Sequence, residues 1–479
     1  MRDTNKKRIN PQLRWPKYTH SVDAKLKDIV CYAYYQSPFY KWFYTKYKVD
    51  VSRFRGLEDY ERLPILNKED ILAFMQEYGT QDMQRAWCVH DLPVITLITT
   101  GTLGKRMSVP YTQNDITFFC TNVLLALLQY WGYNGGPLNG IVPDSSRDPV
   151  SIILNAMAAA TNGRIFHWSE FHKGLDGFQS LVYGETVTFM SLPSLCRFIK
   201  MAHSVAILNS LNVRYILTLV APSELRQGLH LKLKKRLQNV NLIPVYGSAE
   251  MGLVGGATPN TFRDAQVHIL QPGYFHIIDN NGALRDIGTG ELLYTSLGRE
   301  AFPFIKYRVG DIVTIEEMQE GNCRRSKLIR FERRSKPLIV KIPDAAGYFI
   351  DILKIEEIVK VIVPFSQIMC VHGQYAQGGD LFVGIFVATP QKLSNVEDVK
   401  CRIIKEIILN HVPSQKIEED GMPQLMSRFT RWFPIFFIDT TEMPKEPDAA
   451  KPRLFLDLMA HTDVYEVGIY RNLLSKLPI

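Results

Sequence analysis

Residues 94–105 read Val-Ile-Thr-Leu-Ile-Thr-Thr-Gly-Thr-Leu-Gly-Lys, a run of apolar and β-branched residues that passes into a polar segment with glycines. The first five residues predict a buried strand, and the remainder predicts a loop. Thr112 and Asp115 then form a Thr-x-x-Asp pattern, which predicts the capped start of a helix. Apolar residues recur along this helix at the spacing of a wide buried face, as far as Trp131. The stretch therefore predicts a strand–loop–helix unit.

The same alternation of apolar runs and helical patterns continues to about residue 300. Residues 151–160 and 231–237 are predicted as helices, and residues 213–220 are predicted as a strand. Such alternation is typical of an α/β protein that is built as a layered sheet.

From about residue 335 the pattern changes to a compact strand–helix–strand–helix module. Its expected elements are paired strands at 338–341 and 348–352, a helix at 355–362, a strand at 381–388, and a helix that begins at the capping box of Ser394 and Glu397. We place the main domain boundary at Ser335. The sequence thus predicts a large layered N-terminal α/β domain, residues 1–334, and a small α+β C-terminal domain, residues 335–479.

Composition excludes several classes of protein. With 479 residues, of which 46% are hydrophobic and 22% charged, the chain is long and apolar enough to bury a core, which excludes disorder. The 56 Lys and Arg against 48 Asp and Glu give a net charge of +8, which permits anionic ligands such as nucleotides but does not call for nucleic acid. Seven scattered cysteines without a Cys-x-x-Cys pattern indicate neither a disulfide scaffold nor a short-spaced zinc site.

Localisation is predicted from signals that the sequence lacks. No apolar run approaches the ~18 residues of a membrane span, and no apolar region of a secretory signal follows the basic N-terminus. The cysteine usage suits a reducing compartment. We therefore expect a cytoplasmic protein without a membrane partner.

The polar loop after residue 98 is the first candidate site. Hydroxyl groups and glycine N–H groups between a strand and a helix can wrap a polyphosphate, because glycine lets the backbone approach closely. The loop is not a Walker motif, since no Gly-Lys-Ser/Thr follows a four-residue gap. Taken alone, it is equally well explained as a connector.

Two acidic residues beside glycines are the next candidates. Glu250 lies in Tyr-Gly-Ser-Ala-Glu-Met-Gly, residues 246–252, after an apolar run, where a carboxylate suits Mg²⁺ beside phosphates. Asp311 follows Gly310 in Tyr-Arg-Val-Gly-Asp, and a fixed carboxylate there can accept both hydroxyls of a ribose. Each has a simpler alternative. A glycine turn with a solvated glutamate is equally favoured, and for the isolated second string a β-turn with a solvated aspartate is favoured.

Two cationic residues complete the candidates. Arg333 belongs to a basic stretch from Arg324 to Lys336, most of which is expected to be a solvated face, but it stands at the boundary between the modules. Lys451 ends the turn-rich residues 443–451, and a lysine on a mobile loop can neutralise the charge that develops during adenylyl transfer. By itself, that lysine would be expected on the surface.

Taken in order, these strings resemble the adenylate-forming superfamily of acyl- and aryl-CoA synthetases, and most closely its phenylacetate–CoA ligase branch. The resemblance spans about residues 25–455. It is carried by the strings at residues 99–105, 246–250, 290–295, 302–311, 332–340 and 355–357, which follow one another in the family's order. The aromatic stretch at 32–40, with 57–59, 63–64 and 68–70, is similar to that branch in particular.

The resemblance implies a hinge at Ser335 and a small mobile C-terminal domain that rotates between two half-reactions. It implies that Glu250 binds Mg²⁺, that Asp311 binds the ribose, and that Arg333 and Lys451 act in catalysis, at the ribose–phosphate region and at the bridging phosphate oxygen. Further residues are implied to bind ATP or, for the last one, CoA: Thr99, Thr100, Gly101, Thr102, Gly104, Lys105, Ala221, Tyr246, Gly247, Ser248 and Gly347.

The sequence departs from the family pattern at several positions. Leu103 replaces the second threonine of the loop, and Ala249 replaces the hydroxyl residue before the glutamate, so two phosphate contacts are lost. Ala221 lies in Val-Ala-Pro-Ser, where the family has Gly-Ala/Gly-Glu beside the adenine. Residues 142–147 replace an aromatic, glycine-rich loop of the acyl pocket, which favours a more polar acid than phenylacetate. Gly347 matches the glycine of the pantetheine tunnel only if the five residues before it are an insertion.

The sequence therefore predicts an ATP- and Mg²⁺-dependent ligase that converts a small carboxylic acid, aromatic or polar, into an acyl-adenylate and pyrophosphate. CoA is the expected acceptor, and an amine or other nitrogen nucleophile in specialised biosynthesis is the alternative. In a third interpretation, Leu103, Ala249 and Ala221 mark a non-catalytic nucleotide-binding relic that binds a partner. No nucleic-acid partner is expected, and a homodimer stays open.

Overall fold

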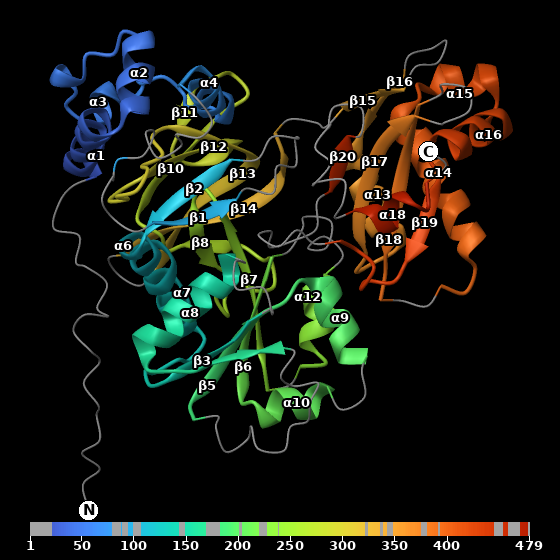
Figure 1. The fold of residues 1–479 in the computed structure, drawn as a ribbon, viewed down its shortest axis with the longest axis horizontal. Coiled ribbons are helices and arrows are strands. Elements are labelled where there is room, and N and C mark those ends of the chain that lie inside the picture. Colours follow the sequence, from blue (N-terminus) through green and yellow to red (C-terminus); the bar gives the residue numbers. More distant parts are fainter. Residues whose placement is uncertain are drawn as a thin grey trace, which may run out of the picture.

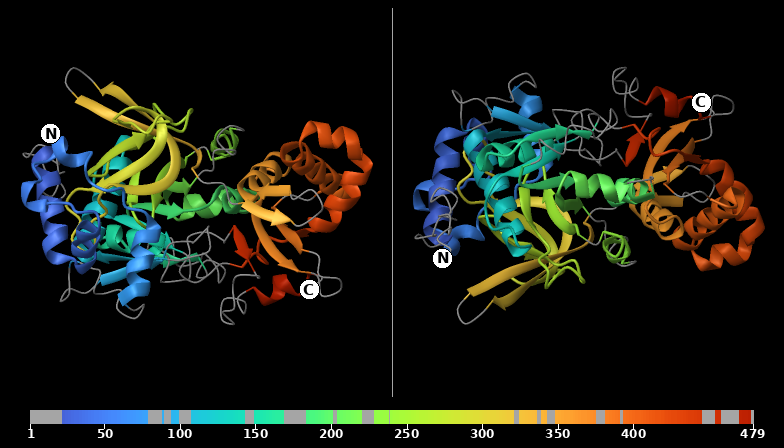
Figure 2. Two further views of the ribbon diagram at one scale, coloured as in Figure 1. Left: turned by 90° about the horizontal axis from the view of Figure 1, so that it is seen from above. Right: turned by 90° about the horizontal axis from the view of Figure 1, so that it is seen from below.

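The computed structural model describes residues 22–78, 88, 94–98, 107–142, 149–168, 183–200, 204–219, 228–237, 239–320, 324–335, 339–342, 348–374, 381–390, 393–444, 454–457 and 470–477. These residues form two bodies (Figure 1). The larger body is built around one long sheet, and the elements that follow residue 335 gather at one end of the molecule. Figure 2 shows the same separation from above and from below.

A twelve-stranded sheet is the framework of the larger body. Its strands are β3 (Leu138–Val142), β4 (Ile165–His167), β5 (Glu185–Phe189), β6 (Val213–Leu219), β7 (Asn241–Ser248), β8 (Gly252–Gly256), β9 (Val267–Ile269), β10 (Gly273–Ile278), β11 (Leu284–Arg285), β12 (Gly288–Ser296), β13 (Tyr307–Glu320) and β14 (Arg324–Arg334). They lie in the order β11-β10-β12-β13-β14-β9-β8-β7-β6-β5-β3-β4. From β4 to β7 the neighbours are parallel, and from β7 to β11 every pairing is antiparallel.

Helices cover both faces of the parallel half. They are α7 (Asn122–Tyr130), α8 (Pro149–Thr161), α9 (Leu192–Lys200), α10 (Ser204–Ser210) and α12 (Leu229–Lys234). Leu217 and Ile243 pack in a cluster with α7 and α8, whereas their chain neighbours Ile216 and Leu242 pack in another with α9, α10 and α12. Successive side chains of a strand point to opposite faces, and here helices cover both faces. Neighbouring residues of these strands are therefore both buried, and the strands appear in the sequence as continuous apolar runs. The predicted α/β alternation is confirmed as far as β7. Its expected continuation to about residue 300 is wrong, because the described residues from β7 to the end of β14 form strands without a helix between them.

The opening strand–loop–helix prediction is confirmed in part. The strand and the helix form as predicted, but an unpredicted strand lies between the loop and the helix. The predicted burial of the first strand is wrong, because it lies in a two-stranded sheet and its Ile95 and Thr96 are exposed. β1 (Val94–Ile98) and β2 (Ser108–Thr112) pair antiparallel in a separate two-stranded sheet. Thr112 and Asp115 form the predicted capping box of α6 (Gln113–Ile116), which continues through a π-helical turn, η4 (Thr117–Thr121), into α7. The loop itself, residues 99–106, lies outside the described residues.

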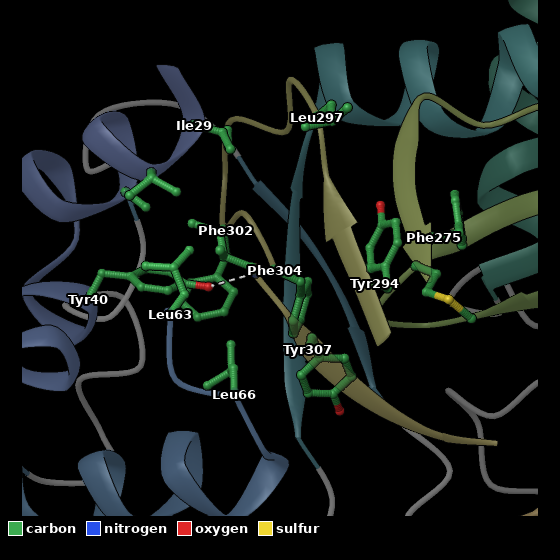
Figure 3. Packing of buried hydrophobic residues seen from close by; sticks show 14 of the residues in the cluster. Ile29, Tyr40, Leu63, Leu66, Phe275, Tyr294, Leu297, Phe302, Phe304 and Tyr307 are labelled. Carbon is green, nitrogen blue, oxygen red and sulfur yellow. Dashed lines mark hydrogen bonds between the residues drawn. The ribbon is translucent and has the colours of Figure 1, made fainter. Parts of the chain in front are cut away.

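An N-terminal group of helices packs on the antiparallel half of the sheet. It consists of α1 (Val22–Gln36), α2 (Pro38–Lys46), η2 (Val51–Arg53), α3 (Leu57–Tyr60) and α4 (Lys68–Tyr78). Tyr40 of α2 is fully buried, donates Oη to the carbonyl of Pro303 at 2.5 Å, and accepts from N of Ile305 at 3.1 Å. Its ring lies 5.6 Å from that of Phe302, and Figure 3 shows both beside Phe304. The aromatic N-terminal stretch thus supports the segment that leads into β13.

The smaller body has its own sheets and core. Its elements are β15 (Ile339–Ile342), β16 (Tyr348–Asp351), α13 (Ile352–Ile362), β17 (Gln367–Gln374), β18 (Leu381–Ala388), α14 (Val396–His411), α15 (Ser414–Asp420), α16 (Met422–Trp432), β19 (Ile435–Ile438), β20 (Phe455–Asp457) and α18 (Arg471–Leu474). β15 pairs with β16 as predicted, and four strands form a sheet in the order β19-β18-β17-β20. The buried isoleucines of α14 share one core with α13, β17 and β18.

The predicted cap of α14 is wrong by one residue. Asn395, not Ser394, has the extended backbone of an N-cap, and its side chain accepts from N of Asp398 at 3.1 Å. Serine and asparagine are about equally good caps, so their order in the sequence does not decide between them.

Every strand of the large sheet precedes Ser335, and the strands of the two C-terminal sheets follow it. The division into two domains at Ser335 stays a prediction. Within the described ranges, none of the helices has the length and apolar character needed to cross a membrane.

Candidate functional site

The hairpin between β7 and β8 presents Glu250 in its turn. Residues 246–248 end β7, residues 249–251 form the turn, and Gly252 opens β8 with a φ of +75°, a conformation that favours glycine. A Cβ on Gly247 would lie 2.3 Å from the carbonyl oxygen of Gly252, so the strands can approach here only because residue 247 has no side chain. The glycines of the predicted motif therefore shape the hairpin that carries the glutamate.

The Glu250 carboxylate contacts a tyrosine from the antiparallel half of the sheet. Tyr307, at the start of β13, donates Oη to Oε1 of Glu250 at 3.2 Å. Burial first, and then the charge of Glu250, raise the pKa of Tyr307 well above its usual value. Tyr307 is therefore a protonated donor at neutral pH, and Glu250 is not the freely solvated glutamate of a simple turn.

Asp311 is buried within β13, with 4% of its surface exposed. Its Oδ2 accepts from Oη of Tyr246 at 2.6 Å, and its Oδ1 accepts from Nη1 of Arg334 at 2.5 Å. The charge of Asp311 raises the pKa of Arg334, and burial followed by the same charge raises the pKa of Tyr246. The carboxylate is thus held between a cation and a neutral donor, and the alternative of a solvated turn residue is wrong.

Arg334 is a site residue that the sequence did not single out. In the β13–β14 pairing, Asp311 lies opposite Arg334 and Ile312 lies opposite Arg333. Arg333 is exposed, and its Nη1 donates to the carbonyl of Arg334 at 3.3 Å. Adjacent residues of a strand point to opposite faces, so the pairing register selects which arginine reaches the aspartate. The role of Arg333 at the nucleotide stays a prediction.

Lys68 is a second residue that the sequence did not predict at the site. Leu66 adds to the edge of β13, since its N donates to the carbonyl of Lys306 at 3.1 Å and its carbonyl accepts from N of Arg308 at 2.9 Å. This pairing leads directly into α4 and places half-buried Lys68 near Glu250. Burial lowers the pKa of Lys68, and the charges of Glu250 and then Glu69 oppose that effect. Only the fold brings this lysine to the hairpin.

The remaining predicted residues divide into two groups. Ser248 supports the turn, because its Oγ accepts from N of Met251 at 3.2 Å. The other predicted residues lie outside the described residues: Thr99, Thr100, Gly101, Thr102, Gly104, Lys105, Ala221, Gly347 and Lys451. The described part of the chain thus brings Tyr246, Glu250 and Asp311 together.

The donor set at Glu250 fits magnesium in the presence of a nucleotide. Within the described part of the chain, no three side chains of His, Cys, Asp or Glu gather into a group that could hold a metal. Mg²⁺ usually keeps several waters and takes one or two carboxylates together with substrate phosphates. A single partly exposed glutamate is therefore a suitable protein ligand.

Comparisons with known proteins bear on the fold and on part of the sequence. None of the known protein-family models matches the chain. Over 107 residues it is 35% identical to a phenylacetate–coenzyme A ligase from Thermus thermophilus. This segment covers 22% of the chain and 22% of that ligase, so the match spans about a fifth of the relative's length.

Two solved ligases are similar along nearly the whole chain. 2-Hydroxyisobutyryl-CoA ligase, in the postadenylation state with R3-HIB-AMP, has a TM-score of 0.58 at 13% identity, over 95% of this chain and 92% of that one. GH3.15 acyl acid amido synthetase also has a TM-score of 0.58, at 12% identity, over 94% and 92%. The fold is therefore that of the adenylate-forming superfamily. The sequence match with a phenylacetate–CoA ligase, over 22% of the chain, confirms the resemblance seen in the motifs.

Proposed function

We propose that this chain is an ATP- and Mg²⁺-dependent carboxylate ligase that forms an acyl-adenylate and pyrophosphate, and then transfers the acyl group to CoA. The observation that carries this proposal is the pair of networks Tyr246–Asp311–Arg334 and Tyr307–Glu250, which link β7 and β13 although these strands are not neighbours. A buried, oriented carboxylate suits a ribose, and a partly exposed one nearby suits a metal beside phosphates.

In the proposed reaction, a carboxylate oxygen of the acid attacks the α-phosphorus of ATP, and the bond from that phosphorus to the bridging oxygen of pyrophosphate breaks. Asp311 orients the ribose, and Tyr246 and Arg334 orient Asp311. Mg²⁺ supplies neutralising charge to the phosphates when bound, and Glu250 is the residue that would hold it. Residues 99–105 and Lys451 are proposed to contact the phosphates from a loop and from the C-terminal module.

ATP–pyrophosphate exchange with a panel of aromatic, hydroxy and amino acids tests the first half-reaction. The wild type should exchange labelled pyrophosphate with at least one acid. Glu250→Gln should reduce Mg²⁺-dependent exchange about tenfold or more, the scale on which metal sites respond to lost partners. Asp311→Ala should weaken ATP binding, whereas Glu317→Gln, at an exposed position on the same strand, is the matched control.

Two results would contradict this proposal. Wild-type exchange rates in both site variants would overturn the assignment of Glu250 and Asp311. ATP binding without exchange for any acid would support a non-catalytic relic instead.

The acceptor is proposed to be CoA, and a nitrogen nucleophile is the second candidate. One observation supports the nitrogen nucleophile as a candidate. The amido synthetase and the CoA ligase are equally similar to this chain in fold, each with a TM-score of 0.58. The enzyme should be given its acid and ATP with CoA, and separately with amines or nitrite, and the products followed by mass. A thioester is expected, and Gly347→Leu should stop it without changing exchange. An amide or N–N product without any thioester would establish the second candidate.

A further inference from the structure

Three consecutive backbone carbonyls in the turn that carries Glu250 are each bound by a buried side chain. The carbonyls of residues 249–251 accept, in order, from Oη of Tyr111 at 2.7 Å, from Nη1 of Arg299 and from Nε2 of Gln271. These three side chains are 0%, 1% and 4% exposed. They come from three different segments of the chain, so the position of the turn is determined from three directions.

Arg299 is the central member of this set. Its guanidinium carbon lies 4.0 Å from the ring centre of Tyr111 and 5.1 Å from that of Phe304, and its Nη2 donates to the carbonyl of Pro110 at 3.0 Å. Burying a cation is unfavourable unless hydrogen bonds and ring contacts offset the cost, and here Nη1 and Nη2 both donate and two rings flank the guanidinium. The planar guanidinium presents several donors in fixed directions, so one side chain can join β2 to the Glu250 peptide.

We propose that Arg299 is the positioning residue of the metal-binding carboxylate. By fixing the Glu250 peptide against β2, it sets the point from which the side chain reaches a nucleotide-bound Mg²⁺. This inference rests on the proposed function, because that function assigns the Glu250 carboxylate to the metal. Hydrogen bonds to the residue that carries a metal ligand commonly determine how well the ligand side chain is placed.

Lys306 offers a matched comparison within the same segment. It is also a buried cation, 3% exposed, and its Nζ donates to backbone carbonyls of Tyr60, Glu61 and Leu63 at 3.2, 2.8 and 2.8 Å. These carbonyls belong to the N-terminal segment and not to the turn. The two cations therefore have similar chemistry and different targets, which separates a loss of positioning from a general loss of stability.

The experiment compares Arg299→Met, Arg299→Lys and Lys306→Met in the full chain. Mn²⁺ binding in the presence of a non-hydrolysable ATP analogue is measured by electron paramagnetic resonance, and backbone amide exchange by mass spectrometry. Arg299→Met should weaken Mn²⁺ binding about tenfold and lower kcat of pyrophosphate exchange, with little change in KM for the acid. It should also speed amide exchange in residues 246–253.

The other two variants make the result specific. Arg299→Lys keeps the charge between the rings but can bind fewer carbonyls, so it should retain part of the Mn²⁺ affinity that Arg299→Met loses. If Arg299→Met does not fold, Arg299→Lys is the variant that tests the inference. Lys306→Met should speed amide exchange in residues 57–66 and change Mn²⁺ affinity less than about twofold.

Unchanged Mn²⁺ affinity in both Arg299 variants, with a loss of thermal stability like that of Lys306→Met, would overturn the inference. The Glu250→Gln variant distinguishes a failure of this inference from a failure of the proposed function. If Glu250→Gln weakens Mn²⁺ binding and the Arg299 variants do not, only the positioning role fails. If Glu250→Gln leaves Mn²⁺ binding unchanged, the metal assignment fails and the positioning role fails with it.

Discussion

Asp311 is a carboxylate whose two oxygens both accept hydrogen bonds from the protein. Arg334 binds one oxygen and Tyr246 the other. A buried carboxylate is stable in its charged form only when it is paired and hydrogen-bonded, and both conditions are met here. Each oxygen retains a further lone pair, so two ribose hydroxyls can still be accepted. The protein donors would therefore set the direction from which Asp311 meets the proposed ribose.

Exchanging one arginine at a time tests this arrangement. Arg334→Met should raise the Kd for ATP about tenfold or more, because removal of the cation leaves the Asp311 charge uncompensated and its orientation free. Arg333→Met, at the exposed neighbouring position, should change the Kd by less than about twofold, in the range of ordinary surface substitutions. Equilibrium binding of ATP measures both, and thermal unfolding reports whether each variant folds.

The opposite result is equally informative. If Arg333→Met loses ATP binding while Arg334→Met keeps it, the role that the family resemblance implies for Arg333 is correct, and the ion pair of Arg334 is structural.

At the scale of elements, the edge pairing of Leu66 with β13 is what places α4 beside the hairpin. Lys68 is the first residue of α4, a position where a cation is unfavourable because the helix dipole is positive there. Its burial adds to that disadvantage by lowering its pKa, and the charge of Glu250 opposes the effect. Since the charge of Lys68 interacts with that of Glu250, we infer that it also acts on the charge of a bound phosphate.

Lys68→Met should therefore lower kcat of pyrophosphate exchange about tenfold or more, the lower range for losing an electrostatic partner at a reacting phosphate. Thermal stability should be unchanged or higher, because the unfavourable charge at the helix start is removed. Lys41→Met, at an exposed position of α2, is the control and should leave exchange at the wild-type rate. Equal rates in both variants would make Lys68 a bystander.

At the scale of the whole molecule, the two bodies meet partly at the helices that cover the parallel half of the sheet. Nζ of Lys200 on α9 donates to the carbonyl of Pro390 at 3.1 Å, and Phe365 packs against the cluster that includes α9, α10 and α12. An exposed hydrogen bond of this kind contributes only about 1 kcal/mol of free energy. The hydrogen bond of Lys200 would therefore resist a rotation of the smaller body only weakly.

If the smaller body rotates between the half-reactions, substitution of Lys451 should affect adenylation and acyl transfer differently. Lys451→Ala should reduce pyrophosphate exchange about 10²-fold, the scale of removing one preorganised electrostatic donor. Consumption of supplied acyl-adenylate and the folding of the protein should be nearly unchanged, because the proposed role of the charge is confined to adenylation. Both steps can be measured on one preparation, with Lys445→Ala as the neighbouring control.

If Lys445→Ala abolishes exchange and Lys451→Ala remains active, the catalytic lysine of the loop has been assigned to the wrong position. Equal losses in both half-reactions for Lys451→Ala would argue against a residue that acts in one conformation only.

The sequence by itself determined features that depend on neighbours along the chain. The capping box of Thr112 and Asp115, the apolar strand at 213–219 and the glycines around Glu250 all follow from local backbone geometry and side-chain periodicity. The same kind of information identified Glu250 and Asp311 as candidates, because their motifs surround them with residues that set the backbone.

Only the tertiary structure decided which distant groups meet these carboxylates. Arg334 and not Arg333 pairs with Asp311 because the β13–β14 register orients them to opposite faces, and a one-residue change of register would exchange them. Arg299 binds the Glu250 carbonyl from a remote segment, and the pairing of Leu66 with β13 brings Lys68 within electrostatic influence of Glu250. Carbonyl groups are present at every residue, so no pattern of residue types reveals which of them a buried cation will bind.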